Sequence, residues 1–144
     1  MAIDRFAGEY IFPSNFYKSP IKYKGIIYPT VEHAFQAAKS QDPDDREFIA
    51  KLPNAREAKI AGRKVCLKRD WEDTKIDIMY SLLKLKFANS FLKEKLLATG
   101  KRELIEGNFW KDKFWGVYEG YGENHLGKLL MKVRDFYNEE GEEE

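Results

Sequence analysis

Hydrophobic positions along the chain change their spacing at Thr30, which separates an aromatic-rich start from a helical remainder. Residues 9–29 carry many aromatic and β-branched side chains, and three prolines and one glycine interrupt them. Short apolar runs broken by such residues are typical of strands joined by turns. We therefore expect a small antiparallel sheet before residue 30.

From Thr30 onward, apolar residues recur every three or four positions, as on a helix with one buried face. Thr30 is the expected N-cap of the first helix. Further helices are predicted from near Asp44 to near Leu52, over 54–65, over 70–89 with Asp70 as its cap, over 90–99 between Ser90 and Gly100, and over about 123–137. The two longest should bury Ile76, Met79, Tyr80, Leu83 and Phe87, and Leu126, Leu129, Leu130, Val133 and Phe136.

About six helices against a small N-terminal sheet make the expected fold α+β and mainly helical. No internal repeat or linker interrupts the pattern, so we predict one domain over residues 1–138. The last residues, 139–144, are almost all glutamate, and we expect them to form an acidic disordered tail.

The first helix carries a second stripe, of polar residues. Val31, Ala34, Phe35 and Ala38 form its apolar side. Glu32, Gln36 and Lys39 lie within about 40° of one line, with roughly 10 Å of rise between the first and the last. This stripe is either the solvated side of a plain amphipathic helix or a row of groups that meets a ligand.

Composition excludes several classes of protein. With 43% apolar and 15% aromatic residues, the chain can form a core. No apolar run approaches the roughly 20 residues that span a bilayer, and the start lacks a signal-peptide pattern. A single cysteine, Cys66, excludes an internal disulfide and a cysteine-ligated zinc site, so we expect a reducing, cytoplasmic setting.

Charge is unevenly distributed. Residues 1–138 hold all 25 basic residues and only 19 of the 24 acidic ones, a formal charge of +6. Such a basic body suits a phosphorylated ligand or nucleic acid, and equally a protein whose lysines only keep it soluble.

Two further clusters could contribute to a site. The first is a basic run that precedes the helix starting near Trp71 and consists of Arg63, Lys64, Lys68 and Arg69. These residues could bind phosphate while the Trp71 indole stacks on a flat heterocycle. The alternative is that Trp71 packs in the core and the lysines point outward. The glycine-rich, aromatic segment 111–124 has the composition of a shaped binding loop.

Several kinds of catalytic site are excluded. His33 and His125 are the only histidines, and no P-loop, GxGxxG or recognised hydrolase order of Ser, His and Asp occurs. We therefore expect chemistry that uses carboxylates, lysine and tryptophan, with no metal and no cofactor.

Taken together, the sequence resembles the NADAR, or YbiA-like, family. The matching motifs, in the family's order, are PSNF (13–16), YPTVEHAFQAAK (28–39), AGRKVCLKRDW (61–71), MYSLLKLKF (79–87), LLATG (96–100), DKFWG (112–116) and NHLGKLLMKVR (124–134). The second helix and EGNFWK (106–111) carry no matching motif, and the acidic tail looks extraneous. The resemblance implies a compact, orthogonal helical bundle with a small sheet.

It also implies an N-glycosidase that cleaves a bond between ribose C1 and nitrogen. Two substrate classes follow from the family: phosphoribosylamino-pyrimidine intermediates of riboflavin synthesis, and ADP-ribose attached to the guanine amino group in nucleic acid. Neither class implies a membrane, and the sequence leaves the oligomeric state open.

The resemblance gives the candidate residues roles. Glu32 would stabilise charge at C1 and move a proton, Lys39 would form a Schiff base, and Asp112 would position water or act as a second acid/base. Trp71 and Trp115 would stack on the base, while Arg63, Lys68 and Arg69 would hold phosphate. The remaining expected substrate contacts are Asn15, Phe16, His33, Gln36, Gly116 and Asn124.

Two other functions remain open at this point. The same basic and stacking groups would serve a non-catalytic module that binds ADP-ribose or modified nucleic acid. A structural or partner-binding protein would instead carry Glu32 and Lys39 as surface polarity, with no pocket that joins them.

Overall fold

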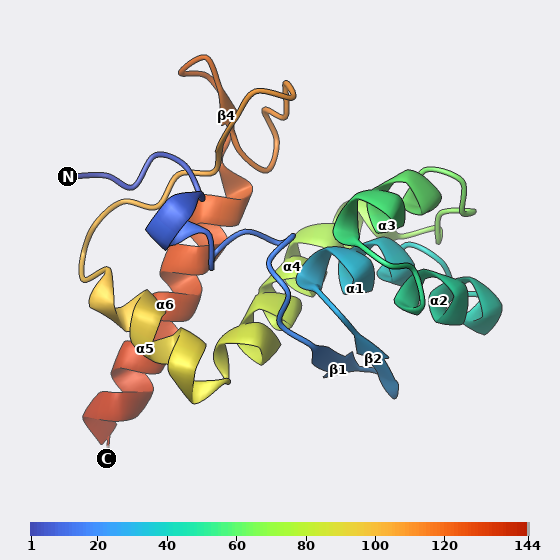
Figure 1. The fold of residues 1–144 in the computed structure, drawn as a ribbon, viewed down its shortest axis with the longest axis horizontal. Helices are drawn as coiled ribbons and strands as arrows, with labels where there is room; N and C mark the ends of the chain where they lie inside the picture. The colour runs from blue at the N-terminus through green and yellow to red at the C-terminus, as the bar shows by residue number, and fades with distance from the viewer. Residues whose placement is uncertain (144) are drawn as a thin grey trace. The chain divides into compact units, whose positions relative to one another are not determined.

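The computed structural model describes residues 1–143, which contain six α-helices and two pairs of short strands (Figure 1). The elements are a 3₁₀ turn Gly8–Tyr10, β1 Ile21–Tyr23, β2 Ile26–Tyr28, α1 Val31–Ala38, α2 Pro43–Ala50, α3 Ala55–Gly62, α4 Trp71–Phe87, α5 Ser90–Ala98, β3 Gly107–Asn108, β4 Val117–Tyr118 and α6 His125–Glu143. The expected mainly helical α+β class with a small antiparallel sheet is confirmed. None of these helices combines the length and the apolar character needed to cross a bilayer.

The chain forms two compact units. One unit is Asn15–Lys86, which holds the β1–β2 hairpin and the helices α1 to α4. The other joins Met1–Ser14 to the chain from Phe87 onward, and it holds α5, α6 and the second strand pair.

The predicted N-terminal sheet is the hairpin of β1 and β2. Ile21 pairs with Tyr28 and Tyr23 pairs with Ile26 in an antiparallel register. The two-residue turn between them places both Lys24 and Gly25 at positive φ, 50° and 87°. Turns with two such residues match the twist of paired strands, which explains why so short a hairpin closes here.

Side-chain caps fix the starts of the three short helices. Thr30 Oγ1 accepts a hydrogen bond from the His33 amide at the start of α1, as the sequence predicts. Asn54 Oδ1 does the same for Glu57 at the start of α3. α1 packs against α2, α3 and β2, so it lies at the centre of this unit (Figure 1).

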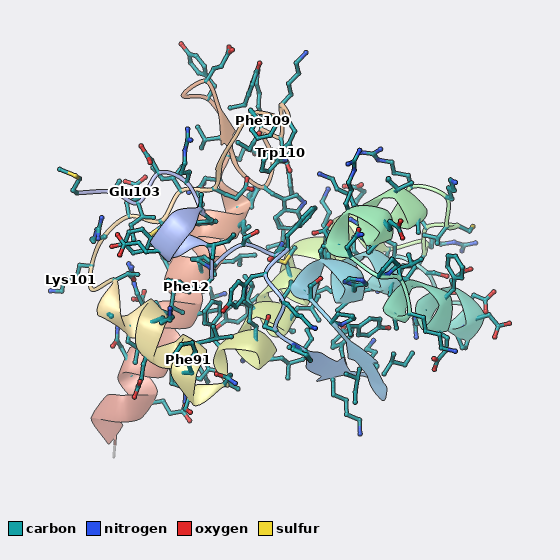
Figure 2. The ribbon with its side chains drawn as sticks, in the orientation of Figure 1. Phe12, Phe91, Lys101, Glu103, Phe109 and Trp110 are labelled. Atoms are coloured by element: carbon teal, nitrogen blue, oxygen red, sulfur yellow. The ribbon has the colours of Figure 1, made fainter. Side chains whose placement is uncertain are left out.

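In the other unit, α5 packs along α6 (Figure 1). Phe12, labelled in Figure 2, meets the Phe87 ring edge-on with centroids 6.4 Å apart. The buried Arg134 of α6 donates from Nη1 to Thr99 Oγ1 at 2.9 Å and to the Arg102 carbonyl at 2.8 Å. This guanidinium therefore ties α6 to the chain that follows α5.

Several helix boundaries differ by a few residues from the sequence-based expectation. α2 begins at Pro43, next to the expected start near Asp44, and ends at Ala50, with Asp42 as its cap. α5 is capped by Asn89, whose Oδ1 accepts from the Leu92 amide, so Ser90 is already its first residue. Asn89 and Ser90 are adjacent residues that can both cap, and the pattern of apolar residues does not separate them.

The last helix begins later and ends later than expected. Asn124 has a φ of 53°, which is incompatible with a right-handed helix, so α6 starts at His125. α6 then runs to Glu143, through the segment from residue 139 where the sequence predicts a disordered tail, and Glu144 lies outside the described residues.

The buried stripe of α6 also differs at one position. Phe136 is 38% exposed, whereas Tyr137 is buried with Leu126, Leu130 and Val133. On a helix, position 137 falls about 20° from the line through position 126, while position 136 falls about 80° away. The aromatic nearer the centre of the stripe is therefore the buried one.

Near the end of α4, Lys86 is a lysine in the core. Its side chain is 1% exposed, and its Nζ lies 5.5 Å from the centroid of the Tyr17 ring. Burial lowers the pKa of Lys86 from 10.5 to about 7, because the charged form loses its hydration.

This burial predicts a pH dependence of stability. Between pH 7 and about pH 10.5 the unfolded state holds a proton on Lys86 that the folded state has released, so the contribution of this group to the unfolding free energy rises with pH. Urea unfolding at pH 6, 8 and 9.5 should give a stability difference, wild type minus Lys86→Met, that rises over this range by about 1 kcal/mol or more.

Lys84→Met is the matched control, since Lys84 is only half-buried and its Nζ lies over the Tyr80 ring. If the unfolding free energies of wild type and Lys86→Met differed by the same amount at all three pH values, the lowered pKa of Lys86 would be contradicted.

Candidate active site

The polar side of α1 is buried. Glu32 is 7% exposed, His33 0% and Gln36 5%, and the apolar residues of the helix are buried as well. Of the two interpretations that the sequence leaves open, the amphipathic helix with a solvated polar side is therefore wrong. Buried polar groups need partners, so their hydrogen bonds decide what each of them does.

Glu32 is held by Gln36 one turn further along. Gln36 Nε2 donates to Glu32 Oε1 at 2.8 Å in a buried environment. The other end of the Gln36 amide, Oε1, is buried and has no hydrogen-bond partner among the described residues. This oxygen faces Gly62 of α3, where an added Cβ would lie 1.9 Å from it. Gln36 therefore positions the carboxylate, and its expected substrate contact remains a prediction.

Lys39 follows the last residue of α1 and is half-buried. Burial lowers its pKa, and the cations Arg63, Lys59 and Lys75 lower it further, while the Glu32 carboxylate opposes them. Lys39 thus lies within electrostatic reach of Glu32. An amine with these neighbours is neutral, and hence nucleophilic, in a larger fraction of molecules than an exposed lysine.

Asn15 lies next to the start of α1. Its carbonyl oxygen accepts the Glu32 amide at 3.1 Å, and its side-chain Nδ2 approaches Met79 Sδ at 3.6 Å. Asn15 Oδ1 is buried and has no hydrogen-bond partner in the described part of the chain. A buried acceptor without a donor is costly, unless a ligand supplies the donor. Phe16, the next residue, is 47% exposed.

His33 joins α1 to the end of α2. Its Nε2 donates to the Leu52 carbonyl at 3.0 Å, which leaves Nδ1 to accept the Thr30 hydroxyl at 2.8 Å in the neutral tautomer. Burial lowers the pKa of His33, in agreement with a neutral ring. Protein atoms thus engage both ring nitrogens, and the expected substrate contact of His33 remains a prediction.

Trp71, at the start of α4, is 5% exposed. Its ring packs against Phe35 of α1 with centroids 5.0 Å apart, and Lys68 Nζ lies 5.9 Å from the ring centroid. These are the contacts of a core residue, and stacking on a substrate stays a prediction. Arg63 and Arg69 are exposed, whereas Lys68 is half-buried and its amide donates to the Lys39 carbonyl at 2.8 Å.

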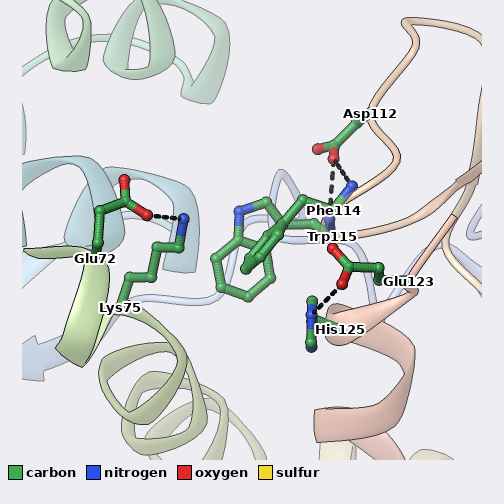
Figure 3. Close-up of polar contacts among 7 residues, drawn as sticks. All are labelled: Glu72, Lys75, Asp112, Phe114, Trp115, Glu123 and His125. Atoms are coloured by element: carbon green, nitrogen blue, oxygen red, sulfur yellow. Dashed lines mark hydrogen bonds and ion pairs between the residues drawn. The ribbon is translucent and has the colours of Figure 1, made fainter.

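Asp112 organises the loop between β3 and β4 in the other unit. Its Oδ1 accepts the amides of Phe114 at 3.0 Å and Trp115 at 2.9 Å (Figure 3). The Trp115 ring meets Phe114 edge-on at 4.9 Å. The carboxylate therefore has one oxygen bound to the loop, and its expected acid/base role remains a prediction.

Gly116 and Asn124 hold the same loop in place. A Cβ at Gly116 would lie 1.9 Å from the Glu106 carboxylate, so only glycine fits there. Asn124 is buried, and its amide accepts from the Glu106 amide at 2.9 Å and donates to the Leu104 carbonyl at 2.9 Å. Both ends of this amide thus bind backbone, where the sequence suggests contacts to a sugar.

Sequence reasoning missed two residues of these networks. Gly62 is the last residue of α3, and its position suggests only the end of a helix. No sequence pattern links Gly62 to Gln36. Glu106 is a half-buried carboxylate whose Oε2 accepts from Asn108 Nδ2 at 3.1 Å, in a stretch that carries no recognisable motif.

Comparison with known proteins identifies the family. The model of the NADAR domain matches residues 5–137, which is nearly the whole chain. The chain belongs to the NADAR domain family. The motifs that suggest this family, from PSNF to NHLGKLLMKVR, all lie within the matched range. They come from both units.

Two curated relatives are similar over most of this NADAR chain. "N-glycosidase YbiA" of Escherichia coli (strain K12) is 39% identical over 126 residues, which cover 85% of this chain and 78% of the relative. "Riboflavin biosynthesis protein" of Vibrio vulnificus (strain YJ016) is 37% identical over 128 residues, 86% of this chain. The chain spans only 35% of the Vibrio protein's length.

A solved structure shares the fold. The NMR structure of the E. coli protein YbiA superposes with a TM-score of 0.88 at 35% sequence identity, and the match covers 100% of this NADAR chain and 88% of that one. This agreement confirms the expected YbiA-like fold.

The contact between Gly62 and Gln36 predicts a mutational effect. Gly62→Ala should lower the free energy of unfolding by about 1–2 kcal/mol, because its methyl group displaces the Gln36 amide, even though alanine favours helices. In a Gln36→Ala background the same change should cost clearly less, since the amide is gone and only the Cβ of residue 36, at 3.0 Å, remains close. Urea unfolding of the four proteins of this double-mutant cycle measures the coupling. An equal cost in both backgrounds would show that the two side chains do not interact.

Proposed function

We propose that this protein is an N-glycosidase that hydrolyses a ribosyl C1–nitrogen bond. The observation that carries the proposal is the buried Glu32 carboxylate of α1, held by Gln36 at 2.8 Å, together with Lys39 directly after that helix, whose pKa is lowered. Membership of the NADAR family and a relative named N-glycosidase support the same reaction class.

The carboxylate has a direct role in such a reaction. Breaking a bond between ribose C1 and nitrogen develops positive charge on C1 and on the ring oxygen. A fixed carboxylate in a water-poor environment stabilises that charge more than it would in water, and it can also move a proton. The bond from Gln36 fixes the orientation of Glu32 before substrate arrives, so little reorganisation is needed.

Lys39 supplies a second route to the same products, in which the sugar ring opens before the C1–nitrogen bond breaks. When an exocyclic N-glycoside opens, the ring oxygen leaves C1 and takes up a proton while a C1–nitrogen imine forms. The neutral Lys39 amine then adds to C1 and expels the amino group of the heterocycle, which leaves a lysine imine. Water hydrolyses this imine and restores Lys39, and the released sugar aldehyde closes again to its ring.

Asn15 favours a sugar as the bound group. Its Oδ1 is a buried acceptor that lacks a donor, and its backbone carbonyl binds the Glu32 amide, so the two residues are neighbours. A ribose hydroxyl is a donor of suitable size for such an acceptor. Asp112, on its loop, is the proposed second acid/base, with Trp115 beside it as the stacking group.

Two substrate classes fit this proposal. One is a phosphoribosylamino-pyrimidine of riboflavin synthesis, for which the name of the Vibrio relative gives support. The other is ADP-ribose attached to the guanine amino group in nucleic acid, for which the basic charge of residues 1–138 gives support. Both present a phosphorylated ribose joined at C1 to an exocyclic nitrogen.

Glu32→Gln tests catalysis against mere binding. The glutamine can still accept the hydrogen bond from Gln36, so the fold should persist, but turnover should fall at least about 100-fold because the negative charge is lost. Incubation with each substrate, with the released base measured by mass spectrometry, gives the rate, and ligand titration gives the affinity. Glu57→Gln, at an exposed position of α3, is the matched control.

A wild type that binds either substrate and never releases free base would instead be a binding module, the alternative function. Full activity in Glu32→Gln would remove the carboxylate from the mechanism.

Borohydride trapping tests Lys39 separately. Reducing agent added during turnover should fix one sugar adduct per chain on Lys39, found by peptide mass spectrometry, because it reduces the imine to a stable amine. Lys39→Arg should give no adduct, whereas Lys59→Arg, a nearby cation on α3, should give the same adduct as wild type. An active enzyme that yields no adduct would remove the lysine imine from the mechanism and leave the carboxylate route through Glu32.

A further inference from the structure

Two neighbouring aromatic residues, Phe109 and Trp110, lie exposed directly after β3 (Figure 2). Phe109 is 84% exposed and Trp110 is 47% exposed. Their rings meet edge to face, with centroids 5.2 Å apart and an angle of 81° between the planes. A single exposed aromatic residue is common on a protein surface, but two large rings side by side keep apolar area in water that the core does not use.

The turn that carries these two rings is closed by one side chain. Asn108 Oδ1 accepts the Asp112 amide at 3.0 Å, and Asn108 Nδ2 donates to the Asp112 carbonyl at 2.9 Å. The backbone of Asn108 pairs with Tyr118 of β4. Residues 109–111, called the tip below, are therefore held between two fixed ends, and the backbone that carries the rings is ordered before a ligand arrives.

The tip is continuous with the loop that holds two of the expected site residues. Asp112 Oδ1, at the end of the closed turn, accepts the amides of Phe114 and Trp115. Trp115 is half-buried beside the Phe114 ring, and Trp71 is a core residue of the other unit. Of the three tryptophans in the chain, Trp110 therefore has the most open indole.

The two rings lie outside the motifs that identify the family. They belong to the stretch EGNFWK (106–111), which carries none of the motifs shared with NADAR proteins. Residues outside the shared motifs are not needed for a chemistry that the family has in common. A loop position next to a site is instead suited to decide which substrate one member prefers.

A flat heterocycle fits the arrangement of the two rings. A base that stacks on one aromatic face meets the other side chain edge-on, and aromatic pairs favour both arrangements. The gain from stacking rises with the apolar area that the partners remove from water. A bicyclic base therefore gains more on this tip than a single pyrimidine ring does, and both side chains are exposed enough to accept the larger base.

We propose that Phe109 and Trp110 form a stacking platform for the heterocycle of the substrate, and that this platform favours guanine over a pyrimidine. The inference rests on the proposed function, and it selects one of the two substrate classes, the guanine-linked ADP-ribose. The platform holds the leaving group by its flat face and takes no part in breaking the bond. Phe109 and Trp110 are thus specificity-determining residues.

The test is an NMR titration of the ¹⁵N-labelled full chain with three probes: guanosine 5′-monophosphate, cytidine 5′-monophosphate and ribose 5-phosphate. The guanine nucleotide should bind tightest and should shift the Trp110 indole N–H, whereas ribose 5-phosphate, which has no base, should leave that signal in place. Phe109→Ala and Trp110→Ala should each weaken binding of the guanine nucleotide about tenfold, as expected for one lost stacking contact, with no change for ribose 5-phosphate. Trp110→Phe keeps a flat ring and should retain most of the affinity.

Phe91→Ala is the matched control, because Phe91 is a 60% exposed residue of α5 in the same unit and lies outside the turn (Figure 2). It should bind all three probes like wild type. The proposal is overturned if Phe91→Ala weakens guanine nucleotide binding as much as Phe109→Ala does, or if both tip variants bind this nucleotide like wild type. Cytidine 5′-monophosphate that binds as tightly as the guanine nucleotide would remove the preference for a bicyclic base.

Binding and turnover are separate measurements, so the platform and the proposed reaction can fail separately. Guanine nucleotide binding that depends on the tip, in a protein that releases no base from either substrate, would keep the platform and remove the glycosidase. Release of guanine nucleotide from its ADP-ribosylated form at the same kcat/KM in wild type and in both tip variants would keep the glycosidase and remove the platform.

Discussion

The hydrogen bond from Gln36 to Glu32 is the interaction on which the candidate site depends. A carboxylate that is 7% exposed loses most of its hydration, and a donor at 2.8 Å restores part of it. α1 can be buried along both its apolar and its polar side because its polar groups bind one another or the neighbouring chain: Gln36 binds Glu32, and His33 joins Thr30 to Leu52. A short helix with these bonds is a rigid support for a reactive group.

The electrostatic environment of α1 follows from this packing. α3 contributes Lys59 to the surroundings of Lys39, and Arg63 follows directly after that helix. These cations and the partial burial act in the same direction on the pKa of Lys39, while Glu32 acts in the opposite direction. The balance between a buried carboxylate and a crowded amine therefore depends on the close approach of α3 to α1.

Sequence patterns predicted the elements well, because local chemistry determines them. Thr30 and Asn54 cap their helices as expected, and the proline- and glycine-rich start gives the predicted hairpin. The side-chain partners could not be predicted in this way. The pattern places Glu32, Gln36 and Lys39 on one line, but it does not reveal that the line is buried or that Gln36 turns toward Glu32, since both depend on how α3 packs against α1. Asn124 and His33 illustrate the same limit, because each amide or ring binds a backbone group distant in sequence.

Gly62 is a helical glycine that the packing of the neighbouring helix requires, although it weakens its own helix. Its φ lies outside the left-handed region, so the backbone does not require glycine, and glycine lowers the intrinsic stability of a helix by about 1 kcal/mol relative to alanine. Glycine makes the end of α3 intrinsically less stable, but its missing side chain leaves the space that the Gln36 amide of α1 occupies. An effort to raise thermostability by replacing helical glycines with alanine would therefore include this position, and would disturb the Glu32 carboxylate through Gln36 without changing either residue.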